Sequence, residues 1–173
     1  MSIPLPNVFK REIAKYVQRH GWYIMRKEQA PYGWDVATDL RRVFQFTAPV
    51  ILDVGANEGQ SVSYYLNNFP NSRIISFEPF ETPYSILEER FGNHPNVSLD
   101  PRALSDQAGE MIVAIQAASQ TNSLRHEMGS EQNPSVGQKI QISTIDQIFQ
   151  EYQLDHVDLL KIDVEGFEAN VLR

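Results

Sequence analysis

The chain has 173 residues, of which 42% are hydrophobic, and it carries a formal net charge of −7. This length and apolar content predict one folded domain with a proper core and exclude a disordered chain. The absence of cysteine excludes disulfides, thiolate nucleophiles and cysteine-ligated zinc.

The charge is unevenly distributed along the chain. Residues 1–48 contain eight Lys or Arg against four acids, whereas the rest contains seven against eighteen. An acidic body argues against nucleic acid as the main partner, because phosphate neutralisation needs a basic face. The N-terminus has no apolar run long enough for a signal peptide or a membrane span. We therefore expect a cytoplasmic protein without a transmembrane segment.

The first 48 residues are predicted to form a helical extension. After Asn7, a good N-cap residue, apolar side chains recur on one helical face until Gly21, which suits a helix end. The stretch "DLRRVFQF" predicts a second short helix. The domain organisation expected is thus an extension over residues 1–48 and a core domain over residues 49–173.

From residue 49 onward, strands and helices are predicted to alternate. Apolar runs predict strands at 50–54, 73–77, 97–99, 111–115, 139–143 and 157–163. Helical spacing predicts helices from about residue 58 to 69 and from 165 to the end. Thr82, as an N-cap followed by Pro83, and Thr144, as a second cap, predict two more helices, which end at about residues 92 and 152. Such β-α-β units wind right-handed into a parallel sheet. The predicted fold class is α/β, with a Rossmann-like, doubly wound, mainly parallel sheet.

One edge of this sheet is expected to lack a partner. If the strand at 157–163 lies beside the strand at 50–54, nothing in this sequence pairs with its outer edge, and an unpaired apolar edge is an aggregation hazard. The sheet thus appears C-terminally incomplete. We expect either further chain or another subunit, as in a homodimer, to cover that edge.

The most informative stretch is "VILDVGANEGQSV", in which a buried strand runs into a glycine turn that opens a helix. Gly55 allows a backbone turn that a Cβ would obstruct, and Gly59 is expected to let the helix pack close to the strand. Ligands of open α/β sheets bind beyond the carboxyl ends of the strands. Glu78 closes the second strand, where a carboxylate accepts hydrogen bonds from two ribose hydroxyls.

Charges around the turn predict the class of ligand. A pyrophosphate binds at a helix N-terminus where backbone N–H groups are unbonded and no anion lies nearby. Asp53 and Glu58 would repel it, and Glu58 is expected in the first helical turn. Asp53 and Glu58 would instead attract a cationic ligand. S-adenosylmethionine carries a sulfonium, an ammonium and an adenosine ribose, and no phosphate, so it fits this site better than NAD does. The alternative is a purely structural turn, because "DxGxxxG" alone is a weak signal.

Several motifs in order along the chain resemble the FkbM family of S-adenosylmethionine-dependent methyltransferases. They are "GWDVATDLRRVF", "ILDVGANEGQS", "IISFEPF", "NVSLDPRALSD", "TNSL" and, most specifically, "STIDQI…VDLLKIDVEGFEANVLR". The resemblance runs from about residue 33 to the end. It implies a class I methyltransferase fold and O-methylation of a hydroxyl on a sugar, glycan or secondary metabolite. Family members continue beyond "VLRG" with further strands, which puts stand-alone activity of the chain in question.

The turn, the end of the second strand and the motifs together define the expected cofactor site. The residues expected to bind S-adenosylmethionine are Asp53, Gly55, Ala56, Asn57, Gly59, Glu78, Pro79, Ala103 and Asp163.

The catalytic residues expected are Asp163, Glu165 and Lys161. Methyl transfer is an in-line displacement, so much of the catalysis is positioning, but a hydroxyl acceptor also needs a base or a metal. Asp163 is expected to hold the cofactor ammonium or to reach the acceptor, and Lys161 to pair with Asp163 or Glu165. A lesser alternative is that Asp163 and Glu165 hold Mg²⁺.

A long polar loop follows the strand at 111–115 and is expected on the acceptor side. It contains Asn122 and Ser123, as well as His126, the one histidine expected within reach of the site as a base.

Two other functions remain open from the sequence. One is an NAD-binding oxidoreductase, against which count Asp53, Glu58 and the replacement of the second loop glycine by Asn57. The other is a truncated domain that binds the cofactor or a partner without turnover.

Overall fold

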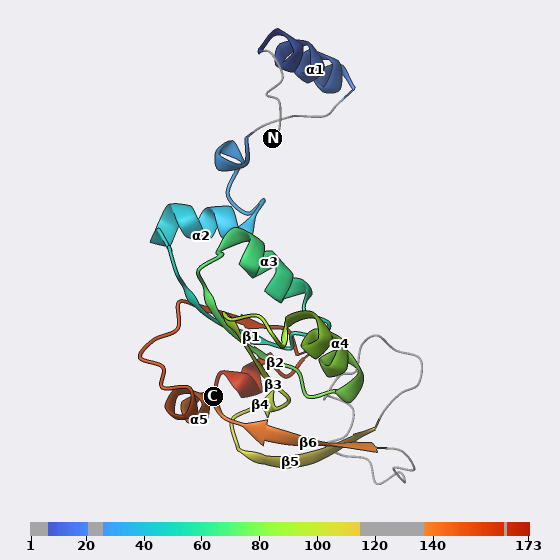
Figure 1. Ribbon diagram of the computed structural model, residues 1–173, viewed down its shortest axis with the longest axis vertical. Helices are drawn as coiled ribbons and strands as arrows, with labels where there is room; N and C mark the ends of the chain where they lie inside the picture. The colour runs from blue at the N-terminus through green and yellow to red at the C-terminus, as the bar shows by residue number, and fades with distance from the viewer. Residues whose placement is uncertain (1–6, 21–25, 115–136, 165) are drawn as a thin grey trace. The chain divides into compact units, whose positions relative to one another are not determined.

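The computed structural model describes residues 7–20, 26–114, 137–164 and 166–173 (Figure 1). The chain divides into two compact units, Met1–Gln45 and Phe46–Arg173. Each unit is described by itself.

The first unit is helical, as the sequence predicts. It contains α1 (Asn7–Arg19), the short 3-10 helix η1 (Lys27–Gln29) and α2 (Val36–Phe44). The second helix starts earlier than predicted because the Asp35 side chain caps it and accepts a hydrogen bond from Thr38 N at 2.8 Å. In the described part of the chain, no helix is long and apolar enough to span a membrane.

The second unit is built on a four-stranded parallel sheet, which confirms the predicted fold class. The strands are β1 (Val50–Val54), β2 (Arg73–Phe77), β3 (Val97–Asp100) and β7 (Leu159–Ile162), in the order β3-β2-β1-β7. All three pairings are parallel. Among the described residues β7 pairs with β1 alone, so the strand that contains Lys161 lies directly beside the strand that leads into the glycine turn.

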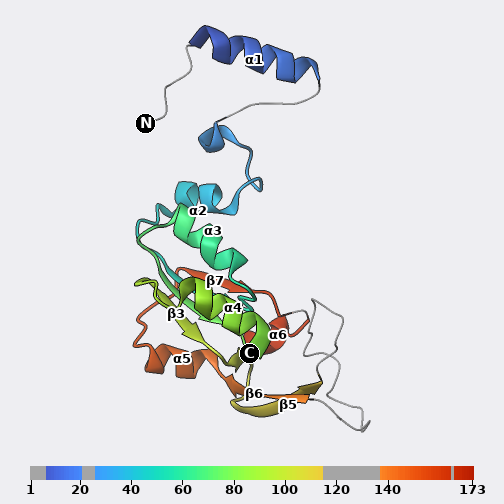
Figure 2. The same cartoon turned by 45° about the vertical axis from the view of Figure 1, so that its right-hand side comes forward.

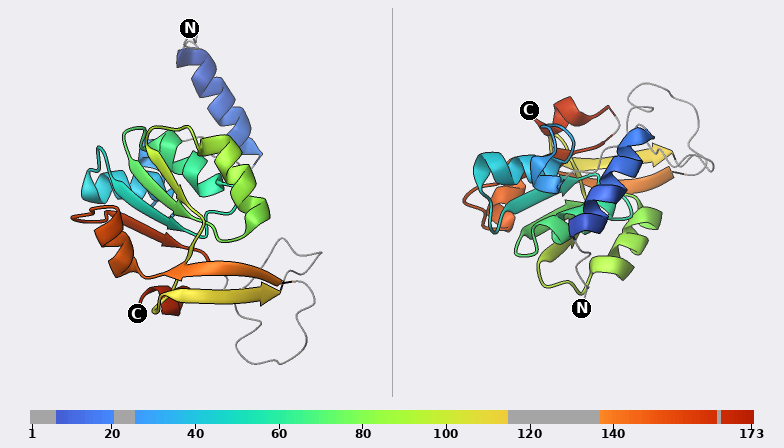
Figure 3. Two further views of the ribbon diagram at one scale, coloured as in Figure 1. Left: turned by 60° about the horizontal axis from the view of Figure 1, so that its bottom comes forward. Right: turned by 90° about the horizontal axis from the view of Figure 1, so that it is seen from above.

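A second sheet of three strands lies below the first in the left view of Figure 3. It consists of β4 (Ala103–Leu104), β5 (Gly109–Ala114) and β6 (Gly137–Ser143), in the order β4-β6-β5. β5 pairs antiparallel with β6 over the whole length of β5. We did not predict β4, because two residues are too few to show a strand pattern.

Helices cover both faces of the parallel sheet (Figures 2 and 3). On one face lie α3 (Gln60–Asn68) and α4 (Glu81–Phe91), and on the other lies α5 (Ile145–Glu151). Successive residues of a strand therefore point alternately to the face covered by α3 and α4 and to the face covered by α5. The side chains that pack with Ile148 of α5 form one buried cluster, which contains Leu52, Val54, Ile75, Phe77, Leu104 and Val171.

In the second unit, the boundaries of three helices differ from the predicted ones. α4 begins at Glu81 rather than at a Thr82 cap, because Pro83 fits in a first turn where N–H groups lack intrahelical partners anyway. α3 begins after Gly59, so Glu58 lies in the preceding turn and not in the first helical turn. The last helix, α6, covers only Glu168–Val171. By contrast, Thr144 caps α5 as predicted.

Candidate functional site

The glycine turn between β1 and α3 uses its own N–H groups internally. Gly55 N and Ala56 N each lie 3.0 Å from Phe77 O, to which they donate. Asn57 N donates to Glu78 Oε2 at 2.9 Å, and Gly59 N donates to Ala56 O at 2.9 Å. A phosphate cradle instead points its backbone N–H groups at the ligand. These four donors are already occupied by the protein.

The two glycines of this turn are required for different reasons. Gly55 has φ +77°, and a Cβ there would lie 2.1 Å from Asp163 O, so only glycine lets the turn pass this close to the end of β7. Gly59 has φ +86°, and a Cβ there would lie 2.5 Å from Phe91 Cε2 and 2.8 Å from Leu87 Cδ1. Both of these side chains belong to α4. Gly59 therefore lets α3 approach α4, and the prediction that it permits packing on the strand is wrong.

Glu78 lies at the carboxyl end of β2 and is 4% exposed, so its carboxylate does not face bulk water. Oε2 accepts the bond from Asn57 N, and Oε1 accepts one from Phe80 N at 3.0 Å. Burial raises the pKa of Glu78 above its ordinary value, although these two N–H groups and the nearby Lys161 oppose that shift. Each oxygen keeps a further lone pair for another donor.

Asp53 is completely buried at the end of β1. Its Oδ2 accepts a hydrogen bond from Ser61 Oγ of α3, and its Oδ1 lies 3.2 Å from Lys161 Nζ. The lysine directs its hydrogen bond at the glycine turn, to Gly55 O at 2.6 Å. Asp53 is the register partner of both Lys161 and Ser76, so the three residues form a polar row across β7, β1 and β2.

Asp163 follows β7 and is exposed, with 70% of its side chain accessible. Its Oδ2 lies 3.7 Å from Lys161 Nζ, which agrees with the expected pairing of Lys161 with Asp163. The structure thus brings Asp53, Gly55 and Asp163 together around one lysine. Their roles toward a ligand stay predictions.

Two further expected cofactor residues, Pro79 and Ala103, have apolar side chains. Pro79 follows Glu78, and its carbonyl accepts a hydrogen bond from Gln138 Nε2 at 2.8 Å. Ala103 of β4 is buried in a separate apolar cluster with Val113, Ile140 and Phe167. Neither side chain makes a polar contact, so each could offer a ligand only backbone atoms or apolar surface.

Several expected site residues cannot be placed. Glu165, Asn122, Ser123 and His126 lie outside the described residues. Within the described ranges, no group of three His, Asp or Glu side chains could hold a metal ion. The Mg²⁺ alternative at Asp163 and Glu165 involves a residue outside these ranges, so it stays a prediction.

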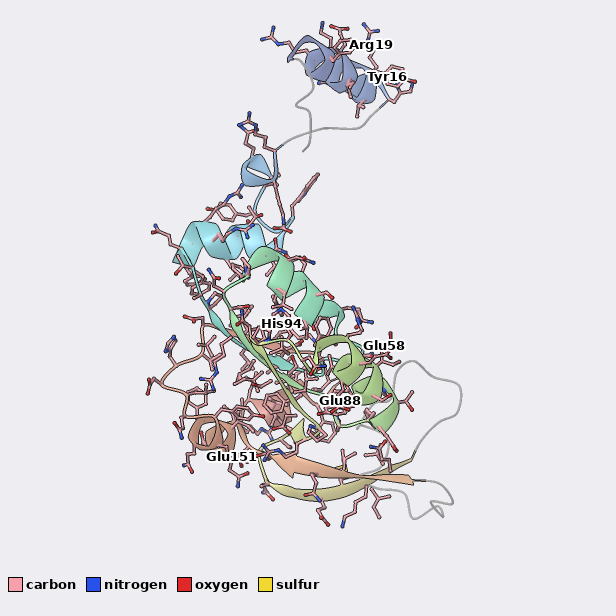
Figure 4. The ribbon with its side chains drawn as sticks, viewed as in Figure 1. Tyr16, Arg19, Glu58, Glu88, His94 and Glu151 are labelled. Atoms are coloured by element: carbon pink, nitrogen blue, oxygen red, sulfur yellow. The ribbon has the colours of Figure 1, made fainter. Side chains whose placement is uncertain are left out.

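A positive charge that the sequence argument omitted lies beside the turn. Arg90 of α4 donates a hydrogen bond to the backbone carbonyl of Glu58, and its second nitrogen lies 3.1 Å from Ser63 Oγ. The Glu58 side chain is exposed and lies next to α4 (Figure 4). The charge around the turn is therefore less negative than its sequence alone indicates.

An ion-pair cluster around a buried acid at the end of β3 was also missed. Asp100 is 4% exposed, and its Oδ2 lies 2.7 Å from Arg102 Nη2. Tyr152 Oη donates to the same oxygen at 3.0 Å, and Glu151 Oε2 of α5 accepts a bond from the same Arg102 Nη2 at 2.5 Å (Figure 4). The sequence does contain a signal for this ion pair: Asp100 ends a strand, and Arg102 follows two residues later.

The charges of this cluster stabilise one another. The hydrogen bonds to Asp100 and then to Glu151 raise the pKa of Arg102, and the bond from Arg102 lowers the pKa of Glu151. Burial, followed by the Asp100 charge, raises the pKa of Tyr152 to about 12. Near neutral pH, Arg102 and Glu151 therefore stay charged and Tyr152 stays neutral.

Comparison with known proteins identifies the family. The model of the family described as methyltransferase FkbM domain matches residues 53–173. Methyltransferase 1 of Beauveria bassiana is 29% identical over 141 residues, which cover 71% of this chain and 57% of that protein. Methyltransferase sdnD of Sordaria araneosa is 24% identical over 154 residues, which cover 72% of this chain and 60% of that protein. The chain thus spans less than two thirds of the length of these relatives.

A solved structure also overlaps part of the fold. It is 1,6-didemethyltoxoflavin-N1-methyltransferase from Burkholderia thailandensis, with bound 1,6-didemethyltoxoflavin and S-adenosylhomocysteine. The overlap covers 64% of this chain and 48% of that one, with 19% identity and a TM-score of 0.30. Since the family model covers well over half of its residues, this chain belongs to the FkbM methyltransferase family.

Proposed function

We propose that this protein binds S-adenosylmethionine at the carboxyl ends of β1 and β2 and transfers its methyl group to a hydroxyl of a small molecule or glycan. The observation that carries the proposal is the internal use of the turn N–H groups, from Gly55 to Asn57 and at Gly59. A dinucleotide needs such donors for its pyrophosphate, whereas a sulfonium cofactor does not. Membership of the family supports the same reaction class.

Glu78 is the residue we assign to the cofactor ribose. Its carboxylate is fixed by two backbone donors, Asn57 N and Phe80 N, which leaves one lone pair on each oxygen for a ribose hydroxyl. A carboxylate that is held in place before the ligand arrives loses little conformational freedom on binding. Glu78 would therefore contribute both affinity and orientation.

Asp163 is the residue we assign to the cofactor ammonium or to the acceptor hydroxyl. Its carboxylate is exposed at the strand end adjacent to the turn, so a ligand can reach it. The chemistry required of the chain is to hold the acceptor oxygen in line with the methyl group and to accept its proton. Glu165 is a second candidate for the proton acceptor. The cytoplasmic location and the homodimer stay predictions.

Titration calorimetry of the chain with S-adenosylhomocysteine and, separately, with NAD⁺ tests the cofactor class. We expect heat with S-adenosylhomocysteine only. Glu78→Gln replaces one acceptor oxygen by a donor and should weaken binding by about tenfold or more. The matched control is Glu81→Gln, which changes an exposed acid three residues away and should bind normally.

Binding of NAD⁺ alone, or unchanged affinity in a folded Glu78→Gln variant, would contradict the proposal. The acceptor can then be sought by incubating the chain with labelled S-adenosylmethionine and a panel of hydroxylated metabolites and glycans. Label recovered in a base-stable methyl ether would support O-methylation. Label recovered on nitrogen would contradict it.

A further inference from the structure

The lysine beneath the glycine turn makes contacts that do not suit a group free to take part in the reaction. Lys161 Nζ donates to Gly55 O at 2.6 Å, and it lies 3.2 Å from Asp53 Oδ1. Only 22% of the lysine side chain is accessible, and Asp53 is fully buried. The ammonium is therefore occupied by groups of the protein itself.

Asp53 needs this cation more than a surface acid would. A buried carboxylate is strongly unfavourable unless it is paired and hydrogen-bonded. Ser61 Oγ supplies a hydrogen bond to Oδ2, but Oδ1 has no hydrogen-bond donor among the described residues. Lys161 is the cation next to that oxygen, so it compensates most of the buried charge.

The same ammonium also fixes the backbone of the turn. Gly55 N bonds to Phe77 O on β2, whereas Gly55 O bonds to Lys161 on β7. The peptide groups of the turn are thus tied to strands on both sides of β1. Next to it, Asn57 N reaches Glu78, so a displaced Gly55 would also disturb the hydrogen bond that orients this carboxylate.

We infer that Lys161 is a positioning residue: it compensates the buried charge of Asp53 and, through Gly55 O, holds the glycine turn in its ligand-binding shape. This replaces the expectation that Lys161 is catalytic. The inference rests on the proposed function for its effect on cofactor affinity. Its effect on the turn does not depend on any ligand.

A double-mutant cycle with Lys161→Met, Asp53→Asn and the double variant separates the two roles. Lys161→Met leaves the Asp53 charge buried without its cation, so the urea midpoint should fall markedly. Asp53→Asn should cost less, because the half-buried lysine can turn toward water and Asp163. The double variant should recover to near the midpoint of Asp53→Asn. Lys139→Met, at an exposed lysine, is the matched control.

Two further measurements test the positioning role itself. In both Lys161→Met and the double variant, amide hydrogen exchange in the peptide over residues 53–62 should be about tenfold faster, since one hydrogen bond that holds the turn is lost. Affinity for S-adenosylhomocysteine should fall by a similar factor in both, even though the double variant regains stability.

The inference is overturned if the double variant recovers normal exchange along with its stability, because Lys161 would then only compensate a charge. It is also overturned if Lys161→Met behaves like Lys139→Met in all three measurements. Failure of the unmodified chain to bind S-adenosylhomocysteine would refute the proposed function instead. The exchange rates of the turn would still decide the role of Lys161.

Discussion

Two buried carboxylates at the carboxyl edge of the parallel sheet have very different surroundings. Asp100, at the end of β3, accepts four hydrogen bonds, three from Arg102 and one from Tyr152. Asp53, at the end of β1, accepts one from Ser61 and keeps an oxygen whose nearest cation is Lys161 at 3.2 Å. Both oxygens of Asp100 therefore have hydrogen-bond donors within the protein, whereas Oδ1 of Asp53, beside the glycine turn, has no hydrogen-bond donor among the described residues.

The difference follows from the cation that each acid has. The guanidinium of Arg102 offers several donors in a fixed plane, so it can bond Asp100 through two nitrogens and also reach Glu151. The ammonium of Lys161 is a compact charge on a flexible stem and serves Gly55 O at the same time. The cluster at Asp100 therefore joins β3 to α5, and the one at Asp53 supports the turn.

The largest expected effect comes from breaking the Asp100 cluster. Arg102→Met removes the partner of a buried carboxylate and should lower the free energy of unfolding by about 3–5 kcal/mol. Urea denaturation measures this loss. The double variant Arg102→Met/Asp100→Asn should recover much of the lost free energy of unfolding. At a temperature where Arg102→Met stays folded, this single variant should bind S-adenosylhomocysteine with normal affinity. If a folded Arg102→Met variant lost this affinity, the Asp100 cluster would contribute to the cofactor site and not only to stability.

Gly55→Ala should have the next largest effect. The residue has positive φ and its Cβ would collide with the backbone oxygen of Asp163, so we expect a loss of about 2–4 kcal/mol and weak cofactor binding. The control is Gly109→Ala, where no atom lies within 4 Å of the new Cβ. Equal unfolding midpoints and equal calorimetric affinities for the two variants would contradict the close packing of the turn on β7.

The smallest effect concerns Glu78, which lies on the strand between the two clusters. Burial raises its pKa in the folded state above the unfolded value, so folding favours the protonated form. Its contribution to stability is complete below the unfolded pKa of about 4.5 and is lost as pH rises through the folded pKa. Urea titrations at several pH values should show this slope in the parent and a flatter profile in Glu78→Gln. Equal slopes would contradict the raised pKa.

The order of elements and the glycine turn could be predicted because both depend on local pattern. The apolar runs of β1 and β2 and the Thr144 cap are visible in a few consecutive residues. β4 was missed because it is short, and the N-cap of α4 was placed at Thr82, two residues after the actual N-cap Phe80, because Thr82 and Pro83 are typical of a helix start. Such boundaries depend on packing against neighbouring elements, which a local pattern does not contain.

The charges around the glycine turn have partners that a local sequence pattern does not reveal. Asp53 and Glu58 were treated as free negative charges around the turn. The tertiary structure buries Asp53 beside Lys161, more than a hundred residues later, and brings Arg90 to the backbone of Glu58. Sign and spacing along the chain do not reveal such partners. A different observation supports the proposal against a phosphate ligand: the N–H groups of Gly55, Ala56, Asn57 and Gly59 are already bonded within the protein.

The sequence by itself determined the fold class, the family and the position of the glycine turn, since these reside in short apolar runs and motifs. Only the tertiary structure decided which buried acid has which cation, because β7 lies against β1 and α5 lies against the end of β3 through long-range packing. Electrostatic energy depends on the distance between charges and on their burial, and the order of residues along the chain specifies neither quantity.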